Sequence, residues 1–111
     1  INHLLRHQSG LYNFTNDSTY NYWMENYMSR DQLLTKVKTY EILFEPGNKM
    51  EYSNTNYILL SFIIEDIDNS SYSESLSKRI ITKVGLKNTK YGSKIKQKNN
   101  ESFSSSNTYL I

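Results

Sequence analysis

Phe44-Glu45-Pro46-Gly47-Asn48-Lys49-Met50-Glu51-Tyr52-Ser53-Asn54-Thr55-Asn56-Tyr57 is predicted to form a turn, a short extended segment and the start of a helix. Pro46 fixes φ and Gly47 is free to take a positive φ, which is the pairing that a type II turn requires, so the chain should reverse direction there. Tyr52 and Asn54 follow in the extended segment. Because side chains two residues apart in such a segment lie on one face, we expect the phenol and the carboxamide to be offered to the same ligand.

The residues that follow predict a buried helix. Residues 57–64 read Tyr-Ile-Leu-Leu-Ser-Phe-Ile-Ile, which is apolar on nearly every helical face and is typical of a helix enclosed between layers. The helix should begin near Asn54 and end where the polar residues Asp66, Asp68, Asn69 and Ser70 accumulate. The other helices of this chain cannot cover so wide an apolar surface, so we expect some of its packing partners to lie outside the chain.

Two capping boxes mark the starts of two further helices. Ser29-Arg30-Asp31-Gln32 has the Ser-x-x-Gln form, and the apolar spacing after it predicts a helix to about Glu41. Ser71-Tyr72-Ser73-Glu74 has the Ser-x-x-Glu form and begins an amphipathic stretch. Gly85 is the expected C-terminal cap of that second helix.

The N-terminal residues 1–7 are predicted to be the tail of a helix that stops before Gly10. His3 and His7 lie four residues apart and would share a helix face, as two metal ligands can. No third ligand with matching spacing stands nearby in the sequence. We therefore predict neither a metal nor another cofactor.

Residues 12–27 are rich in Asn, Asp, Ser, Thr and Tyr, which is typical of a loop whose polar side chains bond their own backbone. The loop also carries the aromatic residues Tyr20, Tyr22, Trp23 and Tyr27. Their rings are either the wall of a ligand pocket or anchors that pin the loop to the core. We favour anchors, because a long loop in a compact domain must pack against something.

Composition narrows the classes of partner. The chain has 111 residues, 13 Lys and Arg against 11 Asp and Glu, and a net charge of +2. That balance gives no reason to expect nucleic acid or an acidic membrane surface as a partner. Cysteine is absent, which excludes disulfides and thiolate metal sites, and no apolar run is long enough to span a membrane. The polar residues 93–111 are expected to form a loop or a mobile segment.

Three stretches of the chain resemble segments of the serine β-lactamase-like hydrolases, and they occur in the order in which that family has them. Pro46-Gly47 followed by Tyr52-Ser53-Asn54 and an apolar helix is similar to the second motif region of that family. Residues 1–11, with their Ser9-Gly10-Leu11 turn, are similar to the helix that precedes this motif in class C β-lactamases, D-alanyl-D-alanine carboxypeptidases, penicillin-binding proteins and related esterases. Val84-Gly85-Leu86-Lys87-Asn88-Thr89 is similar to the Pro-Leu-Gly-Met-x-x-Thr segment that follows it, with the proline absent. The resemblance extends to about residue 92.

The resemblance implies an α+β parent fold of the β-lactamase and transpeptidase type, of which residues 1–92 would be mainly the helical part. In the family a serine attacks a carbonyl to form an acyl-enzyme. By residue-by-residue match, Tyr52 would help to move the serine proton, and Asn54 would orient the lysine of the Ser-x-x-Lys motif and contact the substrate. A free phenol has a pKa of about 10, so this role needs neighbouring cations or a relay to that lysine.

The implied substrate is a β-lactam, a D-alanyl peptide or ester, or another acyl ester, including peptidoglycan-like compounds. The choice among these compounds lies in residues mostly outside the chain. The family also suggests a bacterial extracytoplasmic location, either periplasmic or at the cell surface. The oligomeric state stays open.

The sequence departs from the family pattern at the nucleophile. Family order places Ser-x-x-Lys before Ile1, whereas Ser75-Leu76-Ser77-Lys78 and Ser93-Lys94-Ile95-Lys96 both follow the Tyr-Ser-Asn element. So short a pattern arises by chance in a chain rich in Ser and Lys. Lys83-Val84-Gly85 imitates the family's Lys-Thr-Gly motif but stands in the place of Pro-Leu-Gly. We therefore expect the chain alone to be inactive.

An alternative interpretation stays open. The chain could be a non-catalytic binding or assembly module, or a decayed pseudoenzyme with the same fold, in which Tyr52 and Asn54 are ordinary strand and cap residues. A Ser-x-x-Lys motif upstream and a Lys-Thr-Gly or His-x-Gly motif downstream in the full-length sequence would favour the hydrolase. Their absence would favour the binding module or the pseudoenzyme.

Overall fold

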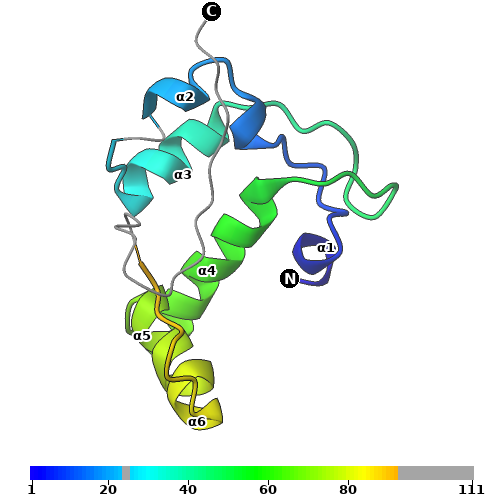
Figure 1. Ribbon diagram of the computed structural model, residues 1–111. Coiled ribbons are helices and arrows are strands. Elements are labelled where there is room, and N and C mark those ends of the chain that lie inside the picture. The colour runs from blue at the N-terminus through cyan, green and yellow to red at the C-terminus, as the bar shows by residue number, and fades with distance from the viewer. Residues whose placement is uncertain (24–25, 93–111) are drawn as a thin grey trace, which may run out of the picture. The chain divides into compact units, whose positions relative to one another are not determined.

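The computed structural model describes residues 1–23 and 26–92 (Figure 1). The chain forms two compact units, Ile1–Ser75 and Leu76–Ile111, and the second is described as far as Gly92. The first unit contains α1 (Asn2–Leu5), the 3₁₀ turn η1 (Phe14–Asn16), α2 (Tyr20–Trp23), α3 (Arg30–Lys38) and α4 (Asn54–Asp68). Helix α5 (Tyr72–Leu76) reaches the boundary, and the π-helical turn η2 (Ser77–Ile81) and α6 (Thr82–Val84) follow it along the chain.

Within the described residues the chain is helical and forms no β-strand, which agrees with the predicted helical part of an α+β fold. An isolated antiparallel bridge pairs Leu11 with Ile42. Three backbone hydrogen bonds of 2.8 Å continue this pairing, from Leu43 N–H to the Gly10 carbonyl, from Gly47 N–H to the Gln8 carbonyl and from Glu51 N–H to the His7 carbonyl. These bonds lay the N-terminal segment along the loop that leads to Tyr52.

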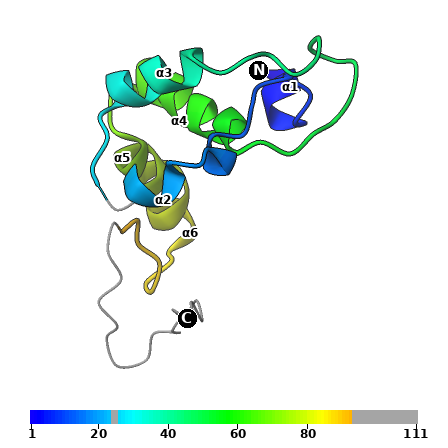
Figure 2. The same cartoon turned by 90° about the horizontal axis from the view of Figure 1, so that it is seen from above.

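Helix α4 is the longest element of the first unit, and α1 and η1 lie against it (Figures 1 and 2). It begins where the sequence predicts and ends at Asp68, and the capping residue Asn69 has a left-handed backbone with a φ of 47°. Its fully buried residues are the polar Thr55 and Asn56, whereas the apolar side chains among residues 58–64 are only half-buried. The first turn of α4 is therefore buried as predicted. The described part of the chain leaves the side chains in the middle of the helix partly exposed.

The type II turn at Pro46-Gly47 is confirmed. The Asn48 N–H donates to the Glu45 carbonyl at 3.1 Å, and Gly47 has a φ of 95°. A positive φ at the third position of a β-turn defines this type and favours glycine there. The turn therefore reverses the chain as predicted.

Gly10 is not the helix stop that the sequence predicts. Helix α1 already ends at Leu5, and Gly10, with a φ of 76°, lies where the chain passes the backbone of Phe44. A Cβ atom on Gly10 would collide with the Phe44 carbonyl oxygen. The physical reason for glycine is this close approach together with the positive φ.

Helix α3 starts with the predicted capping box. The Gln32 N–H donates to the Ser29 hydroxyl at 3.2 Å, and the Ser29 N–H donates to the Gln32 side chain at 2.9 Å. The helix ends at Lys38 rather than near Glu41, because its last turn tightens to three-residue bonds and Ile42 then enters the bridge described above. The start of α3 is therefore set locally and its end by pairing with a distant segment.

A charged pair joins α3 to α4. Two guanidinium nitrogens of Arg30 donate to the two carboxylate oxygens of Asp66 at 2.6 and 2.7 Å. The guanidinium also lies over the Phe62 ring, 5.0 Å from its centroid. The hydrogen bonds from Arg30 lower the pKa of Asp66, and those to Asp66 raise the pKa of Arg30. A bidentate contact of this kind fixes direction as well as distance, so it holds the start of α3 on α4.

The second predicted capping box is also present. The Glu74 N–H donates to the Ser71 hydroxyl at 3.3 Å, and the Ser71 N–H donates to the Glu74 carboxylate at 2.9 Å. The single helix predicted after it is instead the three consecutive elements α5, η2 and α6, because a π-helical turn interrupts the regular spacing. The run ends as predicted at Gly85, which has a left-handed φ of 75°.

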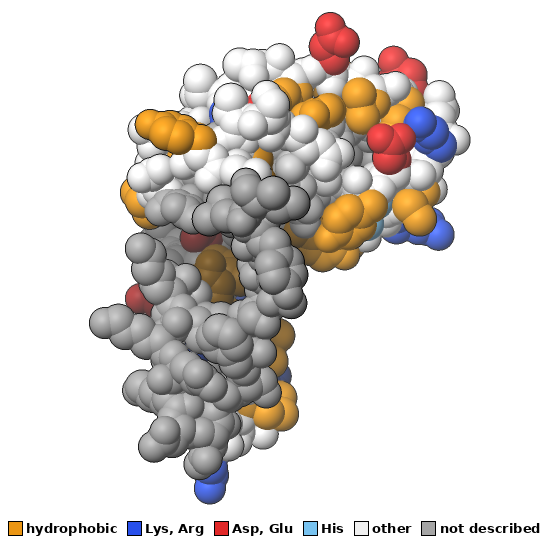
Figure 3. Space-filling model, turned by 45° about the horizontal axis from the view of Figure 1, so that its top comes forward, with side chains coloured by type: hydrophobic (Ala, Val, Ile, Leu, Met, Phe, Trp, Pro, Cys, Tyr) orange, Lys and Arg blue, Asp and Glu red, His pale blue; other side chains and the backbone are white. Residues whose placement is uncertain are grey.

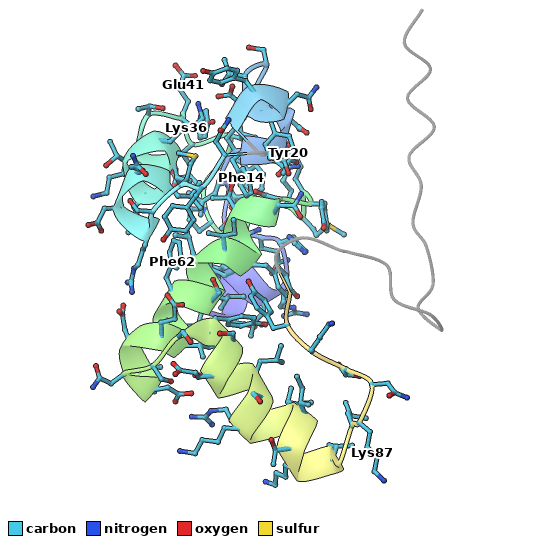
Figure 4. All side chains as sticks on the ribbon, turned by 60° about the vertical axis from the view of Figure 1, so that its left-hand side comes forward. Phe14, Tyr20, Lys36, Glu41, Phe62 and Lys87 are labelled. Carbon is cyan, nitrogen blue, oxygen red and sulfur yellow. The ribbon has the colours of Figure 1, made fainter. Side chains whose placement is uncertain are left out.

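Phe14 is the one large apolar side chain that is buried in the described part of the chain. Its ring meets the Tyr20 ring edge-on, with centroids 5.8 Å apart (Figure 4), so Tyr20 is an anchor as predicted. Tyr22 and Tyr27 are 82% and 91% exposed, so the anchor interpretation is wrong for them. Helix α2 has a single turn, and a residue two positions after Tyr20 points to its other side.

Three predictions fall outside what the structure describes. They concern the Trp23 side chain, the Ser93-Lys94-Ile95-Lys96 pattern and the character of the polar segment 93–111. Among the residues that are described, no helix is both long enough and apolar enough to cross a membrane.

Candidate active site

Tyr52 and Asn54 lie side by side at the start of α4. The Tyr52 hydroxyl donates to Asn54 Oδ1 at 3.0 Å, and Tyr52 is 63% exposed. Ser53 between them is extended, with φ −147° and ψ 121°, which places its two neighbours on one face as predicted. The structure thus presents a phenol and a carboxamide together at the surface of the first unit.

Buried polar side chains hold this pair in place. Ser53 is 2% exposed, and Thr55 is fully buried. The Thr55 hydroxyl donates to the Tyr12 carbonyl at 2.6 Å and accepts from the Phe14 N–H at 3.1 Å, while the Ser53 hydroxyl donates to the same Tyr12 carbonyl at 3.3 Å. Because buried polar groups are costly to leave without partners, these bonds fix residues 12–14 against the first turn of α4.

His7 packs between two tyrosines of the motif. Its ring centroid lies 4.5 Å from that of Tyr52 and 5.1 Å from that of Tyr57. The Ser53 N–H donates to His7 Nδ1 at 3.2 Å, and Asn56 Nδ2 lies 3.1 Å from the same atom. Because a backbone N–H can only donate, Nδ1 is an acceptor here. These contacts give His7 a structural role at the start of α4.

His3, the other histidine considered as a metal ligand, lies beside Gly47. Its Nε2 is 3.4 Å from the place that a Cβ atom on Gly47 would occupy, so it packs against the type II turn. Residues 1–23 and 26–92 contain no group of three or more His, Asp or Glu side chains that could hold a metal ion.

Asn13 and Thr15 hold the Asn54 carboxamide, and sequence reasoning missed both. Asn54 Nδ2 donates to Asn13 Oδ1 at 3.3 Å and to Thr15 Oγ1 at 3.1 Å. The backbone N–H of Asn54 also donates to Asn13 Oδ1 at 3.0 Å, so Asn13 caps α4 in place of Ser53, whose side chain forms no capping bond. The one local signal was the Asn-x-Thr spacing, which is typical of an asparagine that bonds the backbone two residues on.

These bonds bear on the two roles predicted for Asn54. Both hydrogens of Nδ2 already have acceptors, and Oδ1 receives the Tyr52 hydroxyl. A carbonyl oxygen has two lone pairs, so Oδ1 can accept one more donor, such as an ammonium group. The arrangement suits the orientation of a lysine, whereas contact between Nδ2 and a substrate would require one of its present bonds to be exchanged.

A second polar cluster links the loop before α2 to the end of α3. The Asp17 carboxylate accepts from the Thr19 N–H at 2.7 Å and from the Tyr40 hydroxyl at 2.6 Å, and it pairs with Lys36 Nζ at 3.1 Å. The hydrogen bonds from Thr19, Tyr40 and Lys36 hold the pKa of Asp17 well below its usual range. Burial, together with the bond to Asp17, raises the pKa of Tyr40 above its usual value. Tyr40 therefore stays protonated and is a poor candidate for proton transfer.

The serine and lysine patterns of the sequence do not complete the site within the described residues. Ser75 is 3% exposed and shares a hydrogen bond of 3.0 Å with Ser70, so its hydroxyl is not offered to a substrate. Lys83-Val84-Gly85 ends helix α6 and does not form a strand. Lys49 pairs with Glu51 at 2.9 Å. No lysine in the described part of the chain bonds Tyr52 or Asn54.

Comparison with known proteins gives matches over most of the chain. A family model described as Beta-lactamase matches residues 1–108. The chain is 33% identical over 93 residues to penicillin-binding protein 4* of Bacillus subtilis (strain 168), which covers 81% of this chain and 20% of that protein. A solved structure of a D-stereospecific amidohydrolase from a Streptomyces species is similar with a TM-score of 0.67 at 30% identity, over 75% of this chain and 27% of that one.

Two further solved structures are similar. The D-amino acid amidase from Ochrobactrum anthropi SV3 gives a TM-score of 0.65 at 30% identity, over 77% of this chain and 25% of that one. A penicillin binding protein from Bacillus halodurans shares the fold, with a TM-score of 0.69 at 24% identity over 83% of this chain and 29% of that one. The chain thus spans between 20% and 29% of the length of these proteins.

Proposed function

Since the chain belongs to the beta-lactamase family of serine hydrolases, we propose that it is part of a catalytic domain that cleaves acyl compounds through a serine acyl-enzyme. Residues 1–92 would supply the segment of that domain that carries Tyr52 and Asn54. The nucleophile would belong to a Ser-x-x-Lys motif outside residues 1–111. We further propose an extracytoplasmic location, which cell fractionation would test.

The observation that carries this proposal is the hydrogen bond of 3.0 Å from the Tyr52 hydroxyl to Asn54 Oδ1. This bond places the phenol oxygen directly beside the Asn54 carboxamide. A serine hydroxyl can pass its proton to this oxygen if the phenol is ionised, or in a relay in which the phenol gives its own proton to a neutral lysine as the serine proton arrives. The large exposed fraction of Tyr52 leaves room for such an approach.

The proposed proton transfer also requires positive charge. A phenol with a pKa of about 10 acts as a base at neutral pH only where cations stabilise the phenolate. The remaining lone pair of Asn54 Oδ1 can accept an ammonium donor, and a lysine held there would lie close to the Tyr52 oxygen. We therefore propose that Asn54 orients the lysine while Tyr52 moves the proton.

For the substrate we propose amides, peptides or esters of D-amino acids, with β-lactams as a second acyl class. Two similar proteins are named for action on D-configured compounds, as a D-stereospecific amidohydrolase and a D-amino acid amidase, and the Bacillus subtilis relative is named a penicillin-binding protein. The full-length protein should hydrolyse D-phenylalanine amide faster than L-phenylalanine amide. Equal rates, or a preference for the L-form, would contradict the proposed substrate class.

The function is tested by Tyr52→Phe in the full-length protein that contains this chain. We expect acylation by a fluorescent penicillin to slow by about 10²- to 10⁴-fold, the range for a positioned proton-transfer group, with a smaller change in initial binding. Tyr57→Phe is the matched control, because the Tyr57 hydroxyl bonds the Leu5 carbonyl at 3.3 Å and is not directed at Asn54. It should be acylated at nearly the wild-type rate.

Two results would count against the proposal. An unchanged acylation rate in Tyr52→Phe would exclude the proton-transfer role. If neither a fluorescent penicillin nor a fluorophosphonate labels the full-length wild-type protein, the non-catalytic binding or assembly module is the better interpretation.

A further inference from the structure

We propose that His7 is a positioning residue that fixes the place of the Tyr52 phenol. The inference rests on the proposed function, because it concerns the side chain that would move the serine proton. Proton transfer requires the phenol oxygen to lie within hydrogen-bond reach of the reacting groups. A small displacement of that oxygen is therefore enough to slow the reaction.

Two hydrogen bonds of His7 hold the main chain on both sides of Tyr52. The His7 carbonyl accepts from the Glu51 N–H at 2.8 Å. His7 Nδ1 accepts from the Ser53 N–H at 3.2 Å. A single residue thus bonds the N–H group one position before Tyr52 and the N–H group one position after it. Because hydrogen bonds are directional, a segment held at two points so close together has little freedom to slide or twist.

The imidazole ring makes a third contact, with the Tyr52 side chain itself. The two ring centroids lie 4.5 Å apart, and the ring planes are tilted by 36°. Rings at this separation touch, so the imidazole limits the swing of the phenol about its side-chain bonds. Because Tyr52 is 63% exposed, His7 supplies a restraint that burial does not.

The His7 ring has a fixed place of its own. Asn56 is fully buried and its Oδ1 accepts from the Ser9 hydroxyl, so its Nδ2 is the end that faces His7 Nδ1, at 3.1 Å. The Tyr57 ring lies 5.1 Å from the imidazole, and the Tyr57 hydroxyl donates to the Leu5 carbonyl at 3.3 Å. The imidazole can therefore act as a support for a neighbouring ring.

The backbone of His7 indicates that the side chain is needed at this position. His7 follows α1 with a left-handed φ of 54°. Its N–H donates to the Leu4 carbonyl at 3.2 Å, and the Gln8 N–H donates to the His3 carbonyl at 2.7 Å. These bonds form a Schellman helix end, in which the left-handed residue is usually glycine. Histidine is less favourable there than glycine, so the contacts of its ring give the reason for its presence.

The test replaces His7 in the full-length protein that contains this chain. His7→Gly removes the ring and suits the left-handed backbone, so it should preserve the end of α1. We expect acylation at saturating fluorescent penicillin to slow by about 10- to 100-fold, because a displacement of about 1 Å can cost that much. The dissociation constant of the initial complex should change little. Ser29→Ala is the stability control, because it removes the cap of α3 and should leave the acylation rate unchanged.

A double-mutant cycle separates positioning from a general loss of structure. In the Tyr52→Phe background, His7→Gly should have almost no further effect, because the hydroxyl through which His7 acts is gone. His7→Asn should be acylated faster than His7→Gly. Asparagine tolerates a left-handed backbone, and its Oδ1 can accept the Ser53 N–H in place of Nδ1.

The tautomer of His7 gives a readout that does not depend on activity. If Nδ1 accepts from the Ser53 N–H, the proton of the neutral ring is on Nε2. NMR of the full-length protein with isotopically labelled histidines should show the Nε2–H tautomer for His7. The His7→Asn variant assigns the resonance, because it removes that signal alone.

The possible failures are distinguishable. The role of His7 would be overturned, and that of Tyr52 left intact, by a wild-type acylation rate in His7→Gly or by an equal loss in the wild-type and Tyr52→Phe backgrounds. A His7→Asn variant as slow as His7→Gly, or an Nδ1–H tautomer, would overturn it as well. An unchanged rate in Tyr52→Phe alone would instead overturn the proposed function, and the role of His7 with it.

Discussion

Asn56 illustrates why polar residues fill the first turn of α4. It is fully buried, its Oδ1 accepts from the Ser9 hydroxyl and its Nδ2 lies beside His7 Nδ1. An apolar side chain of the same size would be buried equally well but would not fix the position of the N-terminal segment. A directional bond fixes both distance and orientation, which the proposed proton transfer would need more than it needs burial. Stability and geometry therefore depend on the same residues here.

Asp17 should make the free energy of unfolding depend on pH. Its pKa is lowered in the folded protein by hydrogen bonds from Thr19, Tyr40 and Lys36, so folding favours the carboxylate. This stabilisation is fully present above the ordinary pKa of about 3.9 and is lost as the pH falls below that value towards the folded pKa. In Asp17→Asn the free energy of unfolding should therefore fall less steeply from about pH 5 to about pH 2 than in the wild type.

Urea denaturation of the full-length protein at a series of pH values measures this slope. Glu41→Gln is the control, because it removes an exposed carboxylate at the end of the same region and should keep the wild-type slope. Equal slopes for the wild type and Asp17→Asn would show that the Asp17 cluster does not contribute.

The placing of Tyr52 and Asn54 on one face was predictable, because it depends only on residues close to them in the sequence. Their spacing in an extended segment after a Pro-Gly turn predicted a shared face, and the structure places the two side chains in contact. Asn13 and His7 do not follow, because they reach the motif across 41 and 46 residues of sequence. A hydrogen bond between such distant residues leaves no periodic pattern in either segment. Only the three-dimensional path of the chain brings them together.

The turns and helix ends show the same difference. Those that depend on adjacent residues were predicted, and those that depend on distant residues were not. The capping box of α3, the Pro46-Gly47 turn and the left-handed Gly85 were predicted, because each needs only three or four adjacent residues. The early end of α3 was not predicted, because it depends on the bridge between Leu11 and Ile42. The role predicted for Gly10, a helix stop, was wrong for a similar reason, because the need for glycine there comes from a contact with a distant segment. Its close neighbour, Phe44, is far away in the sequence.

Gly10→Ala should separate two segments that the site requires to be adjacent. The positive φ of 76° is unfavourable for alanine, and the added Cβ would meet the Phe44 carbonyl oxygen. Strain of this kind costs about 1 to 3 kcal/mol even without a collision, so we expect a loss at or above the upper end of that range. Gly92→Ala is the control, because a Cβ there would meet nothing within 4 Å. Denaturant unfolding of the full-length protein measures both, and equal stability of wild type and Gly10→Ala would contradict the close approach.

At the scale of the whole molecule, the β-lactamase and transpeptidase-like fold predicted from the sequence is confirmed by its solved neighbours. The described residues bury a single large apolar side chain, that of Phe14. Hydrophobic side chains lie at several places on the surface that Figure 3 shows, and Ile1, Met50, Ile67 and Val84 are each more than half exposed. The chain spans only 20% to 29% of the proteins that it matches. We expect other parts of such a domain to cover this surface.

The 111-residue chain alone should therefore be helical but loosely packed or self-associating. The apolar side chains in the middle of α4 are half-buried, and each side chain left exposed forgoes roughly 1.5 to 3 kcal/mol, against a total stability of about 5 to 15 kcal/mol for an ordinary domain. Several such losses equal the whole stability. We expect strong binding of a hydrophobic dye and a broad thermal transition followed by circular dichroism, whereas the full-length protein should bind little dye. A sharp, cooperative unfolding transition of a monomer without dye binding would mean that these residues form a complete domain by themselves.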